Sequence, residues 1–253
     1  MKIGISALLY NLDEAINLCK EINEIKHIEL GIDNLYECDE IYKYIDKLKE
    51  LNVSLSIHLP MELNLCENIE FIRQSWVRFV EEMNYKLKHL NICYYNLHLG
   101  YVISDRLNKN REKYLDISCS MLNDIINKTK ANISIENTYS NNGDLSNVGN
   151  KLYDFEYIFN KVENEKLWFC YDTGHNLINR DNYIDKLHNK IRIVHLSDND
   201  GKKDIHIGIN KGILDKKEVK TIIYLEPEFL ILEIKYHDIK ESIEYIKEIK
   251  KEV

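Results

Sequence analysis

The chain has 253 residues, of which 44% are apolar and 30% are charged, and its formal net charge is −8. This length suits one large core, and the net negative charge argues against bulk electrostatic attraction to nucleic acid. No apolar run approaches the roughly 18 residues of a membrane span, and the first residues read as a strand rather than a secretory leader, so we expect a cytoplasmic protein without a membrane segment. The six cysteines form no C-x-x-C pair, which predicts reduced core residues rather than disulfides or a zinc knuckle.

Eight short apolar runs recur along the chain, and segments with helical periodicity fill most of the intervals between them. The runs are Lys2–Ser6, Ile28–Gly31, Val53–His58, Tyr94–His98, Ile133–Glu136, Trp168–Asp172, Ile191–His195 and Phe229–Glu233. This alternation predicts a closed parallel (β/α)8 barrel, an α/β fold, as a single domain over residues 1–253. The alternative is an open doubly wound sheet, but such a sheet usually has fewer strands, and no G-x-G-x-x-G motif follows the first run.

The clearest helical patterns cover residues 41–51, 72–87, 121–126, 152–162 and 239–249, and weaker ones cover 183–187 and 219–224. Asn11, three residues before Glu14, is predicted to cap the first helix. The polar stretch Ser140–Asn150 is predicted to be a mobile loop at the rim of the barrel. In the segment SDNDG, Asp198 and Asp200 are predicted to be solvated turn residues.

Six successive runs end in a histidine or a carboxylate, and further ligand-type residues follow two of them. In a parallel barrel these strand ends meet at one rim, so their side chains can converge on a divalent cation such as Mn²⁺, Zn²⁺, Co²⁺ or Mg²⁺. Taken singly, each residue has a plainer interpretation, as a hydrogen-bonded structural histidine, a helix cap or a carboxylate paired with lysine. Taken together they predict a metal site built from His58, His98, Glu136, Asp172, His175, His195, Asp204, His206 and Glu233.

Six segments of the chain resemble the xylose isomerase-like barrels, a family of sugar isomerases and epimerases that is related to the endonuclease IV-type apurinic endonucleases. They are IHLP (57–60), NLHLG (96–100), IENT (135–138), YDTGHNL (171–177), HLSDNDGKKDIHIGINKG (195–212) and LILEIK (230–235). In the isomerase branch, the resemblance implies that Glu136, Asp172, His195 and Glu233 bind one metal ion. It also implies that Glu136 and Glu233 act as acid and base and that His175 contacts the substrate. His58, His98 and His206 would then also orient substrate hydroxyls.

This ligand set suits proton abstraction beside a carbonyl, because a cation stabilises the enediolate while one carboxylate removes a proton and the other returns it. The sequence therefore favours a sugar or sugar-phosphate isomerase or epimerase with a carbohydrate substrate. Nucleic acid is not an expected partner, and a homodimer is among the expectations since barrels of this kind often pair.

The nuclease branch is the alternative, because the resemblance implies three zinc ions held by all nine residues, with His58, His98, His175, Asp204 and His206 completing two further sites. The loop LPMELNL after His58 departs from that branch, since it lacks the aromatic wedge expected for opening a duplex. A metal-free barrel that only binds a ligand is the third alternative.

Overall fold

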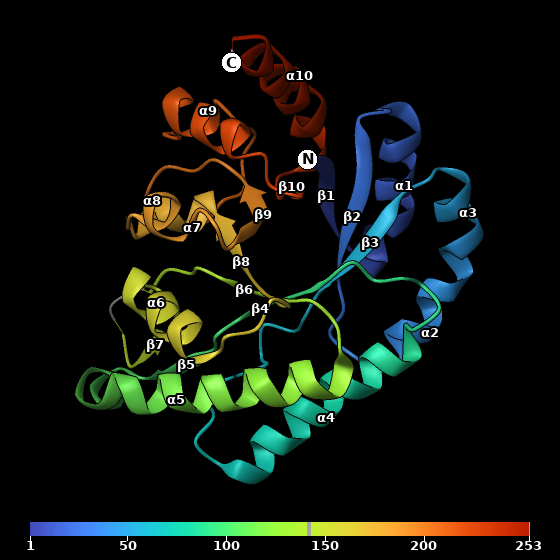
Figure 1. The fold of residues 1–253 in the computed structure, drawn as a ribbon. Helices are drawn as coiled ribbons and strands as arrows, with labels where there is room; N and C mark the ends of the chain where they lie inside the picture. Colours follow the sequence, from blue (N-terminus) through green and yellow to red (C-terminus); the bar gives the residue numbers. More distant parts are fainter. Residues whose placement is uncertain (141–142, 253) are drawn as a thin grey trace.

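The computed structural model describes residues 1–140 and 143–252, in which eight parallel strands close into a barrel that is surrounded by helices (Figure 1). The barrel strands are β1 (Lys2–Leu8), β2 (Ile25–Gly31), β3 (Ser54–His58), β4 (Tyr95–His98), β6 (Ile133–Glu136), β8 (Leu167–Asp172), β9 (Ile191–Leu196) and β10 (Phe229–Leu232). Their order around the barrel is β1-β10-β9-β8-β6-β4-β3-β2, so each strand lies beside its neighbours in sequence. The predicted (β/α)8 fold is confirmed, and all eight predicted runs coincide with these strands.

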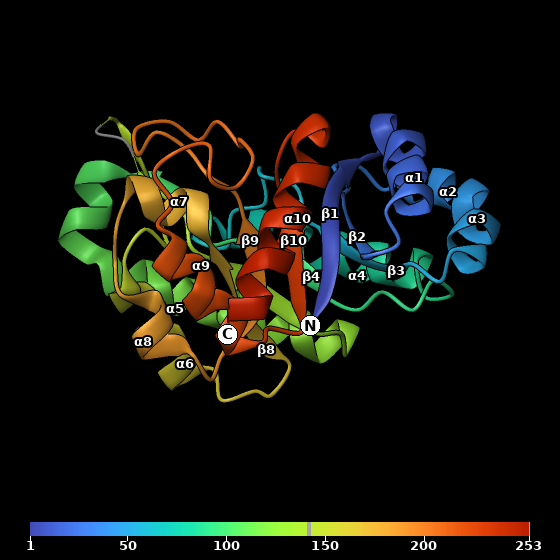
Figure 2. The ribbon, with the colours of Figure 1, turned by 90° about the horizontal axis from the view of Figure 1, so that it is seen from above.

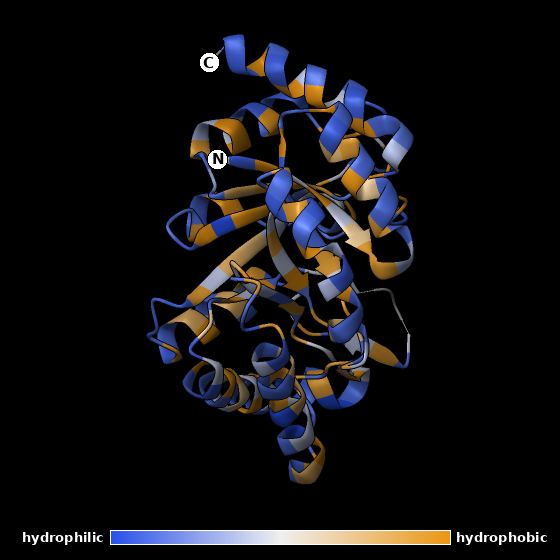
Figure 3. Cartoon of the chain, turned by 90° about the vertical axis from the view of Figure 1, so that its right-hand side faces the viewer, coloured by the Kyte–Doolittle hydropathy of each residue, from blue (hydrophilic) through white to orange (hydrophobic). Residues whose placement is uncertain are grey.

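Helices follow the strands and form the outer ring of the molecule. They are α1 (Leu12–Glu21), α2 (Glu37–Ile41), α3 (Ile45–Glu50), α4 (Glu70–Lys86), α5 (Ser104–Thr129), α6 (Leu152–Lys161), α7 (Thr173–Ile178), α8 (Tyr183–Leu187), α9 (Lys216–Leu225) and α10 (Tyr236–Glu252), with 3-10 turns η1 (Leu9–Asn11) and η2 (Tyr42–Tyr44). Hydrophilic residues dominate the outer helix surfaces, whereas the strands are largely hydrophobic (Figure 3). In the described part of the chain, no helix is both long and apolar enough to cross a membrane.

The barrel closes where the first strand pairs with the last. Lys2, Ile3, Gly4 and Ile5 of β1 lie opposite Phe229, Leu230, Ile231 and Leu232 of β10, in parallel register. Strand β1 begins and helix α10 ends at the amino-terminal face of the barrel, while the loop between β9 and α9 lies at the opposite face (Figure 2). All six cysteines are free, as predicted, and five of them are buried.

Three local predictions need correction. The periodic segment 41–51 is broken into α2, η2 and α3 rather than forming one helix. Helix α1 does begin after Asn11, but the Asn11 side chain caps no helical N–H and instead accepts a hydrogen bond from the backbone N–H of Leu8. Within Ser140–Asn150, strand β7 (Leu145–Asn147) pairs antiparallel with β5 (Tyr101–Ile103), while residues 141–142 lie outside the described residues.

Candidate metal centre

Four strands bring Glu136, Asp172, His195 and Glu233 together at the carboxyl-terminal rim of the barrel. Each offers a ligand atom, and these four atoms all lie within 4.8 Å of one another. Nδ1 of His195 lies 2.9 Å from Oε2 of Glu233, 3.3 Å from Oε2 of Glu136 and 3.9 Å from Oδ2 of Asp172. The predicted quartet thus converges on one point, as the ligands of a single cation do.

A second group of ligand atoms shares Glu136 with the first. His58 at the end of β3 and His98 at the end of β4 form this group with Glu136, again with ligand atoms within 4.8 Å of one another. Nε2 of His58 lies 3.5 Å from Oε2 of Glu136, and Nε2 of His98 lies 3.8 Å from Oε1. Glu136 therefore belongs to two groups of ligand atoms, as a carboxylate that bridges two metal positions does.

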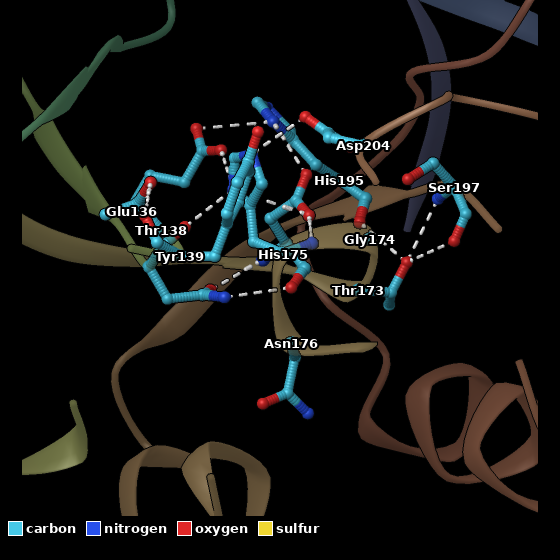
Figure 4. A network of polar contacts seen from close by, with 12 residues as sticks. Glu136, Thr138, Tyr139, Thr173, Gly174, His175, Asn176, His195, Ser197 and Asp204 are labelled. Carbon is cyan, nitrogen blue, oxygen red and sulfur yellow. Dashed lines mark hydrogen bonds and ion pairs between the residues drawn. The ribbon is translucent and has the colours of Figure 1, made fainter. Parts of the chain in front are cut away.

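A third group forms around Asp204, in the loop that follows β9. Oδ2 of Asp204 lies 3.2 Å from Nε2 of His175 and 3.1 Å from Nε2 of His206. His175 stands between Glu136 on one side and Asp204 on the other, as Figure 4 shows, and its Nδ1 lies 3.3 Å from Oε1 of Glu136. Two histidines and one carboxylate are a sound set of zinc ligands.

Backbone groups hold the histidine rings of this third group in place. Nδ1 of His175 lies 2.8 Å from the carbonyl oxygen of Asn137, and Nδ1 of His206 lies 2.8 Å from that of Glu233. Since a carbonyl oxygen only accepts, both Nδ1 atoms carry the hydrogen, and Nε2 of each ring faces Asp204 with a free lone pair when the ring is neutral. His206 also adopts a left-handed backbone conformation with φ +46°, which is rare for a residue other than glycine.

The charges of the centre fit a cation. Burial alone would raise the pKa of the Glu233 carboxyl, but His195 beside it lowers this pKa to about 2. Burial, together with the nearby Glu136 and Glu233, raises the pKa of Asp172 to about 7. Desolvation lowers the pKa of the half-buried His58, but Glu136 outweighs it and raises this pKa to about 9. In the protein alone, protons on such groups balance the carboxylates, and a divalent cation would displace them.

Buried polar atoms without hydrogen-bond partners also indicate a cation site. Among the described residues, both ring nitrogens of His195, Oδ2 of Asp172 and Oδ1 of Asp204 are buried without a partner in hydrogen-bond geometry. Buried polar groups are seldom left in this state, and Nδ1 of His195 and Oδ2 of Asp172, 3.9 Å apart, could both direct lone pairs at one metal ion. The residues present therefore fit a divalent cation.

A cavity of about 790 Å³ opens above the centre. Its lining includes residues of the second and third ligand groups together with Glu136 and Glu233, whereas Asp172 and His195 lie beneath them. The four histidines predicted to contact substrate all line it, namely His58, His98, His175 and His206. Their contact with a substrate stays a prediction.

Residues 26–249 match the sequence model of a family described as the xylose isomerase-like TIM barrel. The chain belongs to this family. The resemblance expected from the sequence is thus confirmed over most of the chain.

Individual relatives of this xylose isomerase-like barrel carry different names. An uncharacterized protein of Methanocaldococcus jannaschii is 28% identical over 235 residues, which are 88% of this chain and 89% of the relative. A protein of Finegoldia magna named probable endonuclease 4 is 27% identical over 203 residues, 74% of this chain and 70% of the relative. Among solved structures, a D-tagatose 3-epimerase-like protein superposes with a TM-score of 0.86 at 22% identity, covering 99% of this chain and 97% of that protein.

One site residue of this xylose isomerase-like barrel escaped the sequence analysis. Glu29 on β2 is only 2% exposed, and its Oε1 lies 2.9 Å from Nε2 of His195. It stands inside a strand rather than at its end, so a search of strand ends passes over it. Strand periodicity is the signal that could have found it, because His27, Glu29 and Gly31 share one face of β2 and alternate with the apolar Ile28 and Leu30.

The prediction for Asp198 also needs correction. It was predicted to be a solvated turn residue, but its exposure is 0%, and it accepts hydrogen bonds from the backbone N–H groups of Asn199, Gly212 and Leu214. The buried carboxylate thereby closes the loop that carries Asp204 and His206. Asp200, by contrast, is exposed and accepts from the N–H groups of two following lysines, as a turn residue does.

Proposed function

We propose that the chain is a divalent-metal-dependent phosphodiester hydrolase with a polynuclear centre, of the kind that the name endonuclease 4 denotes in its relatives. The observation that carries this proposal is the position of Glu136 between two groups of ligand atoms. A carboxylate shared in this way supports a centre with more than one ion. The third group around Asp204 extends the centre along the floor of the cavity.

The surroundings of Glu136 support a bridging ligand rather than a free base. Its side chain is 1% exposed, four histidine rings approach it within 4 Å, and the side-chain amide of Asn96 donates a hydrogen bond to Oε2. A general base needs at least one oxygen that can reach the substrate's proton. Glu233, whose side chain is 27% exposed and lines the cavity, is better placed for proton transfer.

The charge balance supports an anionic substrate. Three divalent cations would bring six positive charges to a site whose lining and floor hold the carboxylates of Glu136, Asp172, Asp204 and Glu233, with the buried Glu29 behind His195. The filled ligand set with Glu29 would carry six positive against five negative charges and would attract a phosphodiester, whereas Glu14 and Asp33 add negative charge to the rest of the cavity lining. When bound, such cations polarise a phosphoryl oxygen and lower the pKa of water, which supplies a nucleophile near neutral pH.

The chain's own residues would divide the remaining work. Glu136, Asp172, His195 and Glu233 would hold one ion, His58 and His98 would hold a second with Glu136, and His175, Asp204 and His206 would hold a third. His206, whose side chain is 33% exposed, lies nearest to solvent and would meet the entering substrate.

An isomerase or epimerase that acts on a sugar or sugar phosphate through a metal-stabilised enediolate is the second candidate. It is favoured by the convergence of two glutamates, Glu136 and Glu233, on the same predicted ion. The cavity of about 790 Å³ also suits a small carbohydrate. In this case one ion suffices, and the histidines around the cavity orient substrate hydroxyls.

Metal counting combined with two activity assays tests the proposal. The protein is stripped with a chelator, reloaded with zinc, and assayed for metal content by mass spectrometry and for scission of a duplex oligonucleotide with one abasic site. We expect about three zinc ions per chain together with scission. His206→Ala should lose one ion and most of the activity, while His188→Ala, at an exposed histidine on the other face, should lose neither.

A different set of results would favour the second candidate. One ion per chain, no scission, and exchange of a ketose α-proton with deuterated water, followed by NMR, would replace the proposal with the second candidate.

A further inference from the structure

The interior of the barrel below the metal centre holds a chain of polar side chains from β2, β3 and the residue preceding β4. Oε1 of Glu29 lies 2.9 Å from Nε2 of His195, and the hydroxyl of Tyr94 donates a hydrogen bond of 2.5 Å to Oε2 of Glu29. The hydroxyl of Ser56 lies 3.4 Å from the same Oε2, and Nε2 of His27 lies 2.8 Å from that hydroxyl. These contacts hold Glu29 from below while it faces His195 above.

Burial of the Glu29 carboxylate in this position is unfavourable for the free energy of folding. Glu29 is 2% exposed, and among the described residues no lysine or arginine forms an ion pair with it. A buried charge without a partner destabilises a protein, most strongly when one partner of a buried pair is removed. The imidazole of His195 is the cationic or N–H donor group that faces it, so the two residues depend on each other.

The two ring nitrogens of His195 have separate surroundings. Nδ1 lies among the oxygens of Glu136, Asp172 and Glu233, whereas Nε2 faces Glu29 alone. The Nε2–H direction lies outside hydrogen-bond geometry, so a small rotation of the ring would be needed to align it with Glu29. A carboxylate at Nε2 favours the tautomer with hydrogen on Nε2, which leaves the lone pair of Nδ1 directed at the ligand cluster.

We infer that Glu29 is a positioning residue for the metal centre, which fixes the tautomer and orientation of His195 and increases the basicity of its Nδ1. Tyr94 and Ser56 hold Glu29 in turn. Carboxylates behind ligating histidines have this effect in metal sites, where their loss weakens metal binding by roughly 10- to 100-fold. This inference rests on the proposed metal centre, but it applies to either candidate reaction, because His195 belongs to the ligand set of both.

Zinc affinity is the first test. The metal-free protein and its variants are titrated with zinc alone against a chromophoric chelator. Glu29→Gln keeps the shape of the side chain and removes its charge, and we expect zinc binding to weaken about 10-fold or more. Tyr94→Phe removes only the hydroxyl that holds Glu29 and should weaken zinc binding by a smaller factor.

A matched control separates positioning from general damage. Asp154 is a carboxylate with 0% exposure that is paired with Arg111 outside the metal centre. Asp154→Asn should lower the urea midpoint of unfolding and leave zinc affinity unchanged, whereas Glu29→Gln should change zinc affinity even at temperatures where the metal-free protein is fully folded. In the zinc-loaded wild type, nitrogen-15 NMR of the histidine rings should show His195 with hydrogen on Nε2.

Three outcomes overturn the inference. They are zinc affinity of Glu29→Gln within twofold of the wild type, an equal loss in Asp154→Asn, or a His195 ring with hydrogen on Nδ1. A wild-type protein that binds no divalent metal would instead refute the metal centre itself, so the two failures are distinguishable.

Discussion

Replacing Asp198 with alanine should destabilise both the fold and the metal centre. The carboxylate accepts three backbone hydrogen bonds of 2.8 Å each, from Asn199, Gly212 and Leu214. Asn199 and Leu214 are buried, whereas Gly212 is exposed, so water can replace the carboxylate at only one of the three donors. Hydrogen bonds to charged groups contribute about 1.5–3 kcal/mol each, so two lost bonds predict about 3–6 kcal/mol less free energy of unfolding.

Urea unfolding of the metal-free protein measures this loss, with Asp200→Ala as the matched control. Asp200 lies two residues away in the same loop, but it is exposed and bonds only to exposed N–H groups, so its replacement should cost less than about 0.5 kcal/mol. Zinc content should also fall in Asp198→Ala alone, because the loop that it closes carries Asp204 and His206. A loss below about 1 kcal/mol, or equal losses in both variants, would refute this account of the loop.

Three further predictions concern stability and the metal. Saturation of the chelator-stripped protein with zinc at roughly 100 times its Kd should raise the free energy of unfolding by about 2.7 kcal/mol, and an unchanged thermal midpoint would contradict this. Burial lowers the pKa of His27 from 6.5 to about 3, so the unfolded chain takes up this proton first on acidification. The contribution of neutral His27 to the free energy of unfolding is therefore complete above pH 6.5. It falls by about 1.4 kcal/mol per pH unit between pH 6.5 and pH 3. His27→Gln should weaken this pH dependence in urea titrations at several pH values. A Cβ on Gly174 would lie 2.4 Å from the hydroxyl oxygen of Ser197, so Gly174→Ala should cost about 1–3 kcal/mol and weaken zinc binding, whereas Gly143→Ala, with no atom within 4 Å, should do neither in the same measurements.

The sequence predicted the barrel and the positions of its ligand-type residues because both follow from local patterns. A parallel strand that stops at a histidine or a carboxylate must present it at one rim, whatever the loops do. His58, His98, Glu136, Asp172 and His195 all stand at such ends, and the structure brings their side chains together. Their roles as ligands or catalytic groups stay predictions.

What the sequence did not predict depends on partners that are distant in the chain. Glu29 becomes a site residue only because its carboxylate meets His195 of β9 inside the barrel. The alternation within β2 predicts the face on which Glu29 lies, but not the residue that it meets there. Asp198 was interpreted from its neighbours in SDNDG, whereas two of its three donors come from Gly212 and Leu214, after the loop has returned. Turn propensity depends only on adjacent residues and does not predict these distant donors. From the sequence, a carboxylate that closes a loop therefore cannot be distinguished from one that is solvated.

The seam between β1 and β10 has a consequence for the time course of folding. Lys2 pairs with Phe229, so contacts that close the barrel join opposite ends of the chain and carry a large loop-closure entropy. The candidate ligands run from His58 at the end of β3 to Glu233 directly after β10, so the set is incomplete in any nascent chain that lacks the last strand. Binding of a cation by all of these ligands should therefore occur late in refolding. A metal-binding signal would then report the time at which β1 pairs with β10.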